Sequence, residues 1–427
     1  MSPPIMQGSS IDSTLHGAYT ASPTKYMLYG RGKNTGCITS LPTVIANLGA
    51  SKAFIITGKS LREKTPVISC IEAILGEAHH AGTYSGVREH APIADIEAAV
   101  AAVRESGADV LLSVGGGSPI DAAKAVAYHL HKENANGGQG KEGAKWIPSI
   151  AVPTTLSVAE TTKNAGFTSA DGSKVAVADV ELVPKGLSSL HVFLGWKGRM
   201  EKKIPTLRKT VNLTDIRALD HALELLYSPS APEVPTKRLA LSSLTDLFTL
   251  LPQCHANPQD ADVRQRLFLG GYAALFPFQF SGALGLSHAI GHAIGSTYGI
   301  PHGITSCISL GKVVRFMAER ARERGGEKTG IGKVGEAVQI ARAVPFVPGL
   351  RGTGDVVRDA LLVAEAVEEL VVKLGLGTGL ADYNVKPGEE EAIAIRALRD
   401  PAHPDLKSVT ELVRTMYSAS SDATTRL

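Results

Sequence analysis

The stretch from residue 109 to residue 130, DVLLSVGGGSPIDAAKAVAYHL, constrains the fold of this chain most strongly. Its apolar run DVLLSV ends directly in three glycines, and a segment with helical spacing follows. Strands that are buried on both faces give such continuous apolar runs, and they occur mostly in parallel sheets, whose connections are usually helices. The stretch therefore predicts a strand, a glycine turn and a covering helix within a parallel β-sheet.

The same alternation extends over the first 185 residues. Strands are predicted at 52–58, 109–114 and 146–155, and helices at 62–75 and 93–106. We therefore predict an α/β domain, residues 1–185, built on a Rossmann-like parallel sheet with helices on both faces.

The pattern changes to helices alone from about residue 216. Helical spacing occurs in five stretches, residues 216–227, 236–251, 262–280, 284–297 and 355–374. They predict an all-helical second domain, residues 186–427. Two domains suit a chain of 427 residues, because single hydrophobic cores stop growing at roughly 250–300 residues. The basic segment 185–215 shows no regular pattern, and it is either a genuine insertion or an error in the gene sequence.

Composition and charge narrow the class of protein. The formal net charge is only +3, which gives no reason to expect a nucleic-acid or membrane partner. The N-terminal MSPPIMQGSSIDS lacks the basic and apolar regions of a signal peptide, and the four cysteines form no CxxC pair. We therefore expect a cytoplasmic protein with reduced thiols.

The glycine turn is a candidate nucleotide site. Gly115, Gly116, Gly117 and Ser118 lie where a strand ends and a helix begins, so the backbone could approach a pyrophosphate and the free N–H groups of the helix start would favour its charge. Thr154 and Thr155 close another predicted strand, at the sheet edge where α/β proteins bind ligands. A simple tight turn and a helix cap are the alternative interpretations.

Histidines are concentrated in GLSHAIGHAIGSTYGIPHG, residues 285–303. His288 and His292 are four residues apart and so lie on one helix face, while His302 follows after a Gly-Pro turn. His221 belongs to another helical stretch, IRALDHALELL. A single buried histidine is usually a hydrogen-bonded core residue, but this group predicts a metal site or a proton-transfer site.

GGGSPIDAAKA, PTTLSVAETT and the histidine segment together resemble the iron-containing (group III) alcohol dehydrogenase family, and within it the maleylacetate reductase branch. The resemblance runs from about residue 25 to 385 and is weak between 184 and 215. It implies a dehydroquinate synthase-like architecture, with the active site in a cleft between a nucleotide-binding domain and a helical domain. It also implies hydride transfer with NADH or NADPH, and it suggests a homodimer.

The residues after the first predicted strand favour NADPH. NAD-preferring sites usually place an acidic side chain here, whereas Gly58, Lys59 and Ser60 leave room and positive charge for a 2′-phosphate. The full set predicted to bind the cofactor is Gly58, Lys59, Ser60, Gly115, Gly116, Gly117, Ser118, Asp121, Thr154, Thr155 and Lys174.

The resemblance implies a metal site of one aspartate and three histidines, which match His221, His288 and His302. The aspartate position, four residues before His221, is Arg217, and Asp220 is turned by about 100° around the helix. An arginine at about 4 Å from a divalent ion would cost roughly twice 4 kcal/mol at an effective dielectric constant of 20. Fe²⁺ or Zn²⁺ is therefore disfavoured, and the maleylacetate reductase branch likewise lacks the aspartate and works without metal.

The predicted catalytic residues are His292, Arg217, His221, His288 and His302. Arg217 and protonated histidines could stabilise negative charge that develops on a substrate oxygen, and His292 is the candidate proton donor. Arg217 could instead bind a substrate carboxylate, or form a salt bridge with Asp220 or Glu224. The predicted function is reduction of a carbonyl or an activated double bond in a small molecule. The alternatives are a metal-dependent alcohol dehydrogenase and a redox-neutral or inactive member of the family.

Overall fold

The computed structural model describes residues 23–28, 37–135, 145–155, 157, 159–188, 204–275, 285–324, 331–332 and 334–418. These residues divide into two compact units. One contains the described residues within Ala21–Met200 together with Gln259–Phe268, and the other those within Glu201–Pro258 and Leu269–Leu427. The predicted boundary between residues 185 and 186 stays a prediction, because residues 189–203 lie outside the described residues.

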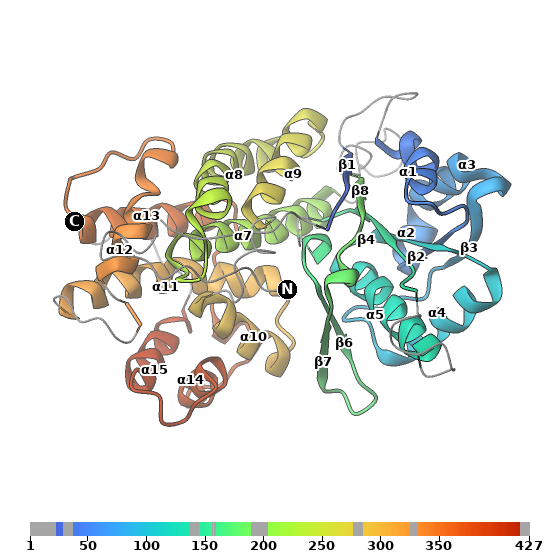
Figure 1. Ribbon diagram of the computed structural model, residues 1–427. Helices are drawn as coiled ribbons and strands as arrows, with labels where there is room; N and C mark the ends of the chain where they lie inside the picture. Colours follow the sequence, from blue (N-terminus) through green and yellow to red (C-terminus); the bar gives the residue numbers. More distant parts are fainter. Residues whose placement is uncertain are drawn as a thin grey trace. The chain divides into compact units, whose positions relative to one another are not determined.

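The first unit is built on a six-stranded parallel sheet (Figure 1). Its strands, in spatial order, are β1 (Tyr26–Leu28), β8 (Gly186–Ser188), β5 (Ser149–Pro153), β4 (Val110–Gly115), β2 (Ala53–Thr57) and β3 (His80–Tyr84). The strands predicted from the three apolar runs are confirmed as β2, β4 and β5, which form the centre of the sheet. The edge strands β1 and β3 were not predicted, nor was β8, which lies between β1 and β5.

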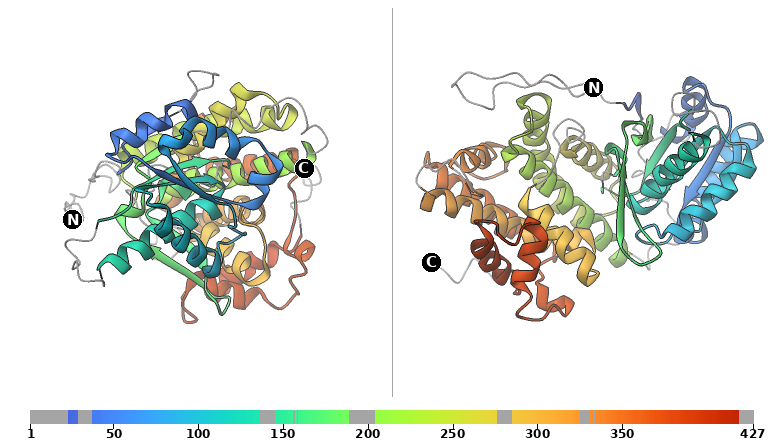
Figure 2. Two further views of the ribbon diagram at one scale, coloured as in Figure 1. Left: turned by 90° about the vertical axis from the view of Figure 1, so that its right-hand side faces the viewer. Right: turned by 60° about the horizontal axis from the view of Figure 1, so that its bottom comes forward.

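Helices cover both faces of this sheet, as the α/β prediction requires (Figure 2). Strand β2 shows the reason, because Ile55 packs with α1 (Leu41–Asn47) and α3 (Val67–His79), whereas Phe54 and Ile56 pack in a second core cluster. That second cluster contains residues of α4 (Ile93–Ser106) and α5 (Gly117–Asn134). Alternate side chains of a strand point to opposite faces, so a strand that is apolar throughout needs a cover on each side.

Two further features of this unit differ from the predictions. The helix expected at 62–75 is two helices, α2 (Lys59–Lys64) and α3, separated at Thr65 and Pro66. Proline lacks the N–H group that a continuous helix needs. An unpredicted antiparallel hairpin, β6 (Asn164–Thr168) and β7 (Lys174–Ala178), also belongs to the unit (Figure 1). Lys174 begins β7, and its side chain lies outside the described part of the chain.

The described residues after Ser188 form helices and no strand, so the all-helical prediction is confirmed for them. Long helices are α7 (Ile204–Tyr227), α8 (Arg238–Ala256), α9 (Ala261–Leu275), α10 (Leu286–Tyr298), α11 (His302–Arg324) and α13 (Val356–Lys373), and shorter ones are α12 (Val334–Ala341), α14 (Glu390–Leu398) and α15 (Leu406–Thr415). Helix α11 packs against α7, α10 and α13, and this packing places the histidines of three helices near one another.

The segment 185–215 is more regular than its sequence suggested. Gly186–Ser188 forms β8, and the backbone of residues 204–215 belongs to α7. Pro205 lies in the first turn of α7, where a missing N–H group costs no hydrogen bond. The expectation of an irregular segment was therefore wrong at both ends, and its middle, residues 189–203, lies outside the described residues.

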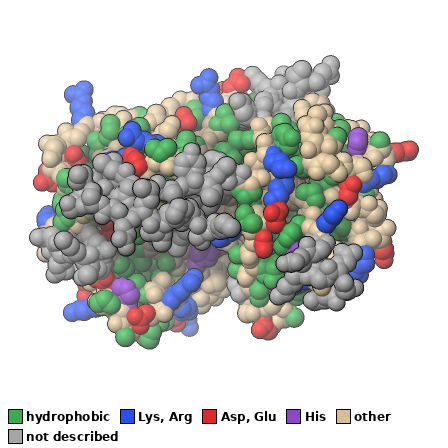
Figure 3. Space-filling view, in the orientation of Figure 1, with side chains coloured by type: hydrophobic (Ala, Val, Ile, Leu, Met, Phe, Trp, Pro, Cys, Tyr) green, Lys and Arg blue, Asp and Glu red, His purple; other side chains and the backbone are tan. Residues whose placement is uncertain are grey.

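The surface shows charged side chains of both signs. On the face drawn in Figure 3, basic and acidic side chains are scattered among one another, as the small net charge of +3 would suggest. In the described part of the chain, no helix combines the length and the apolar character that a membrane span requires.

Candidate active site

The glycine turn joins β4 to α5 in the first unit. Gly115 has a φ of +148°, and a Cβ at this position would lie 2.7 Å from Cγ of Pro119. Pro119 itself lies in the first turn of α5, where proline is well tolerated. A side chain at position 115 would therefore be strained by the backbone and would collide with the helix start.

The turn lies against the segment that follows β5. A Cβ on Gly116 would be 3.3 Å from Cγ2 and Oγ1 of Thr155, and a Cβ on Gly117 would be 3.5 Å from Oγ of Ser157. The backbone N–H of Thr154 donates to the carbonyl oxygen of Gly115 at 2.9 Å. The structure thus brings together the glycines and threonines that were predicted to share one site.

Two hydroxyl groups beside the turn have no hydrogen-bond partner in the described part of the chain. They are Oγ1 of Thr155 and Oγ of Ser157, and both atoms are buried. Buried hydroxyls normally have a partner, so these two are available to a ligand. Glycines that leave room for a ligand, unpartnered hydroxyls and the start of α5 together fit the pyrophosphate of a dinucleotide. The prediction did not include Ser157, although it follows the two threonines closely in sequence.

Three of the other predicted cofactor residues follow β2, the neighbour of β4 in the sheet. Gly58 precedes α2 directly after β2, and Lys59 and Ser60 are exposed in its first turn. Nζ of Lys59 is 3.7 Å from Oε1 of Glu63, an exposed pair that holds the lysine only weakly. Ser118 is already engaged, because its Oγ accepts a hydrogen bond from the backbone N–H of His90 at 3.1 Å.

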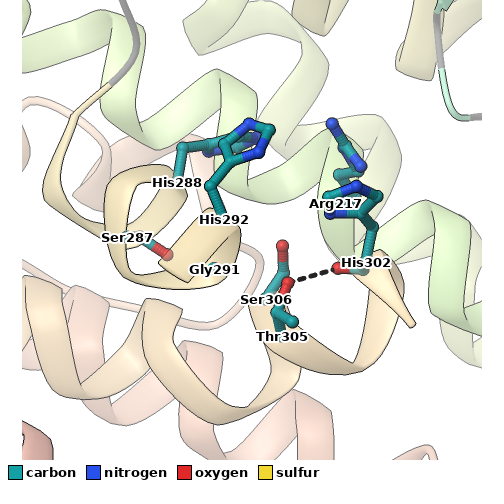
Figure 4. Close-up of a pocket in the computed structure, with 8 residues that line it drawn as sticks. All are labelled: Arg217, Ser287, His288, Gly291, His292, His302, Thr305 and Ser306. Atoms are coloured by element: carbon teal, nitrogen blue, oxygen red, sulfur yellow. Dashed lines mark hydrogen bonds between the residues drawn. The ribbon is translucent and has the colours of Figure 1, made fainter. Parts of the chain in front are cut away.

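A second candidate region is a small pocket of the helical unit (Figure 4). It is lined by Arg217, Ser287, His288, Gly291, His292, His302, Thr305 and Ser306. Arg217 reaches the pocket from α7, His288 and His292 from α10, and His302 from the start of α11 (Figure 4). The prediction that His288 and His292 share one helix is confirmed. His221 is almost fully buried and does not line the pocket.

A buried glutamate joins His288 to the beginning of α10. Glu224 accepts hydrogen bonds from the backbone N–H groups of Gly285 at 2.8 Å and Ser287 at 2.7 Å. Its Oε2 also lies 2.9 Å from Nδ1 of His288. The carboxylate therefore satisfies N–H groups that a helix start leaves free, and its charge is favourable at this end of the helix dipole.

Asp220, one helical turn before Glu224, supports the same histidine. Its Oδ2 accepts from the hydroxyls of Ser306 at 2.7 Å and Ser287 at 3.1 Å, and it lies 3.4 Å from Nδ1 of His288. The prediction considered Glu224 only as a partner of Arg217, and Asp220 as such a partner or as a metal ligand turned away from the site. The structure gives them His288 as a partner, which the sequence could not reveal because Glu224 and His288 are 64 positions apart.

The surroundings give the histidines different charges. Burial opposes the charged form of His288, but Asp220 and Glu224 outweigh it and raise the pKa to about 9. Burial, with the nearby charges of His288 and Arg217, holds the pKa of His221 well below its usual value. Burial, together with Arg217, His288 and Arg399, lowers the pKa of His292 to about 4. Of these three histidines, His288 is therefore protonated at pH 7, whereas His221 and His292 are neutral.

The three histidines predicted as metal ligands take part in two ring contacts, and their role as ligands stays a prediction. The ring of His221 stacks on that of His288, with centroids 4.6 Å apart, whereas the ring of His302 meets that of His292 edge-on at 5.3 Å. Among the described residues, the side chains whose potential ligand atoms lie within 4.8 Å of one another are Asp220, Glu224 and His288. The prediction did not include the two carboxylates as ligands.

Comparison with known proteins covers both units. Residues 27–187 match the family model for iron-containing alcohol dehydrogenase, and residues 212–417 match the model for the C-terminal part of the Fe-containing alcohol dehydrogenase family. The chain is 29% identical over 336 residues to the Escherichia coli K12 protein named "Probable alcohol dehydrogenase EutG", which covers 77% of each protein. It is also 28% identical over 259 residues to maleylacetate reductase 2 of Cupriavidus pinatubonensis, covering 60% of this chain and 62% of that protein.

The fold agrees with these matches. The crystal structure of maleylacetate reductase from a Rhizobium species superposes with a TM-score of 0.72, covering 94% of this chain and 97% of that one. Its sequence identity of 21% makes this a likeness of fold alone. Because the two family models together match most of both units, the chain belongs to the iron-containing alcohol dehydrogenase family.

Proposed function

We propose that this oxidoreductase uses NADPH or NADH to reduce a carbonyl or an activated double bond in a small carboxylated substrate, as a maleylacetate reductase would. The observation that carries the proposal is the charge of the pocket in the helical unit. Its eight lining residues include Arg217 and three histidines but no acid, and His288 holds an additional proton. Such a pocket favours an anionic substrate and stabilises negative charge that develops on its oxygen.

The glycine turn of the first unit would hold the dinucleotide. The backbone at Gly116 and Gly117 would approach the pyrophosphate, and the hydroxyls of Thr155 and Ser157 would donate to it. When bound, the nicotinamide supplies a hydride. Gly58 and the weakly held Lys59 would leave room and charge for a 2′-phosphate, so we propose NADPH as the preferred form.

The residues of the pocket would then have separate tasks. Nε2 of His288 has no hydrogen-bond partner in the described part of the chain, while Nδ1 is held by Glu224 and Asp220. A charged imidazole fixed in this way can donate from Nε2 to a substrate oxygen on which negative charge develops. Arg217 would bind a substrate carboxylate. His292 remains our candidate for passing a proton to the product. Because it is neutral, it would relay the proton, accepting one from solvent at one ring nitrogen and giving up the one on the other.

The residues present do not fit the metal that the family name implies. Oδ2 of Asp220 and both oxygens of Glu224 already accept hydrogen bonds from two serine hydroxyls and from backbone N–H groups. Nδ1 of His288 is held by the same carboxylates, and Arg217 adds a positive charge that acts on His221 and His292. A divalent ion would have to displace these donors and tolerate the arginine. We therefore propose a reaction that does not depend on a metal.

The test is consumption of NADPH absorbance with maleylacetate, followed by a panel of small uncharged aldehydes. We expect turnover of the carboxylated substrate and little of the aldehydes. Arg217→Met should lower kcat/KM for maleylacetate by roughly 30-fold or more, about 2 kcal/mol, because the substrate carboxylate loses its charged partner. The same variant should change any residual aldehyde reduction much less. Equal turnover of charged and uncharged substrates, unaffected by the substitution, would contradict the proposed substrate class.

A further inference from the structure

We propose that Lys124 is a positioning residue for the cofactor: its buried ammonium group ties the hydroxyl-bearing segment after β5 to the helix that begins at the glycine turn. This inference rests on the proposed function, because it assumes that the dinucleotide binds at that turn. It concerns a residue in the interior of α5, away from the ligand itself.

Lys124 is almost completely buried, which is unusual for a lysine, because its relative exposure is only 1%. Its Nζ donates to the backbone carbonyl oxygens of Ala159 at 2.6 Å, Thr162 at 2.7 Å and Asn164 at 2.9 Å, and it lies 3.1 Å from Oγ1 of Thr162. Burying an ammonium group is costly unless its protons are all used. Here all of its acceptors belong to one short segment of the chain.

That segment is continuous with the proposed cofactor-binding residues. Thr155 and Ser157, whose hydroxyls face Gly116 and Gly117, lie just before Ala159. A Cβ on Gly117 would also be 3.9 Å from Cβ of Ala159. Ala159 therefore lies beside the glycine turn while its carbonyl oxygen is held by Lys124. The lysine fixes how far the hydroxyls stand from the backbone of the turn.

The charge of Lys124 is also part of this arrangement. Glu160, in the middle of the tied segment, is fully buried, and neither of its carboxylate oxygens has a hydrogen-bond partner in the described part of the chain. Asp121, one turn earlier on α5, lies 4.0 Å from Nζ of Lys124. A neutral side chain at position 124 would take the charged donor away from three carbonyl groups and the nearby ammonium group away from Glu160 and Asp121. The segment would then lose the position that the cofactor requires.

The helical unit offers a matched control. Nζ of Lys312 donates to the backbone carbonyl oxygens of Thr415 at 2.7 Å and Ser418 at 2.8 Å. Lys312→Met therefore removes the same kind of tie, a lysine holding backbone carbonyl groups, from a place that the proposal does not connect with the cofactor. A purely structural role for Lys124 would make both lysine variants lose thermal stability and keep their affinity for NADPH.

The experiment measures the Kd for NADPH and the Tm of the full-length parent, Lys124→Met and Lys312→Met. We expect Lys124→Met to bind NADPH roughly tenfold more weakly or worse, and Lys312→Met to stay within about twofold of the parent. An unchanged Kd in a folded Lys124→Met protein overturns the inference while leaving the proposed function intact. A parent protein that binds neither NADPH nor NADH overturns the proposed function itself.

A milder variant covers the case in which Lys124→Met does not fold. Thr162→Val removes only the hydroxyl that accepts from Nζ of Lys124 and that donates to the carbonyl oxygen of Ala159 at 3.1 Å. We expect a several-fold weaker Kd for NADPH, with a smaller loss of Tm than in Lys312→Met. If Thr162→Val binds NADPH as tightly as the parent does, the positioning role is refuted.

Discussion

Replacing Glu224 by glutamine should both destabilise the helical unit and remove the extra proton from His288. The carboxylate is fully buried and accepts from the N–H groups of Gly285 and Ser287 and from Nδ1 of His288. A glutamine amide keeps one acceptor oxygen but turns the other position into a donor. If the –NH₂ group takes the place of Oε2, it faces two N–H groups, at Gly285 and at His288.

The size of the effect follows from those two contacts. Hydrogen bonds to a charged group contribute about 1.5–3 kcal/mol each, so losing two of them predicts a loss of about 3 kcal/mol or more in the free energy of unfolding. His288 can relieve the conflict by giving up its Nδ1 proton, which makes the ring neutral. Its raised pKa of about 9, against an ordinary value of 6.5, should then fall.

The loss of that proton has a definite sign in a pH titration. A raised native-state pKa contributes stability that is fully present below about pH 6.5 and is lost as the pH rises through about 9. The parent should therefore become less stable between these pH values, and Glu224→Gln should show a flatter profile there. Thermal or denaturant unfolding at several pH values measures both effects.

Glu365→Gln is the matched control. Glu365 pairs with Arg358 at 2.8 Å, but both side chains are substantially exposed, so the substitution should cost no more than about 1 kcal/mol. A Glu224→Gln protein as stable as this control, with the pH slope of the parent, would refute our explanation of how His288 is held.

Three other substitutions test the remaining parts of the account. Gly116→Val places a branched side chain where a Cβ alone would already be 3.3 Å from Thr155, so NADPH affinity should fall about tenfold or more by calorimetry; unchanged affinity would place the cofactor elsewhere. Gly58→Asp should shift the ratio of kcat/KM values from NADPH toward NADH, because a carboxylate would oppose the 2′-phosphate; an unchanged ratio would separate this turn from the adenosine ribose. Arg217→Asp should raise the affinity for added Zn²⁺ and weaken turnover of maleylacetate, and no gain in metal binding would mean that Arg217 does not exclude the ion.

The parts of the fold that could be predicted from the sequence are those with a complete local pattern. All five residues of β2 are buried, and a continuous apolar run of that kind is visible without a structure. Strand β3, HAGTY, is only partly buried at the edge of the sheet, so its sequence lacks such a run. Helix α11 was missed because Gly, Ser and Thr interrupt the apolar spacing of its first turns, although tertiary packing keeps them helical.

In the candidate site, too, the sequence revealed only what a local pattern records. The spacing of His288 and His292 predicted that both lie on one helix, and the structure places both on α10. The glycine and threonine motifs predicted that two segments share a site, and these segments are in contact. The rotation of Asp220 away from His221 was a sound argument about one helix. That argument could not show that another helix, α10, packs on the side of α7 that carries Asp220. This packing places Nδ1 of His288 3.4 Å from Oδ2 of Asp220. Contacts between helices depend on packing that no local spacing records.

The central claim is that the protein reduces its substrate without a metal, and metal analysis combined with a chelation assay tests it most directly. Iron and zinc are quantified in the purified full-length protein, and NADPH oxidation with maleylacetate is then measured before chelation, after chelation and after re-addition of Fe²⁺ or Zn²⁺. We predict far less than one equivalent of metal and the same activity in all three states. Stoichiometric metal that is lost together with activity, and activity that returns with the ion, would contradict the account and make His221, His288 and His302 ligands.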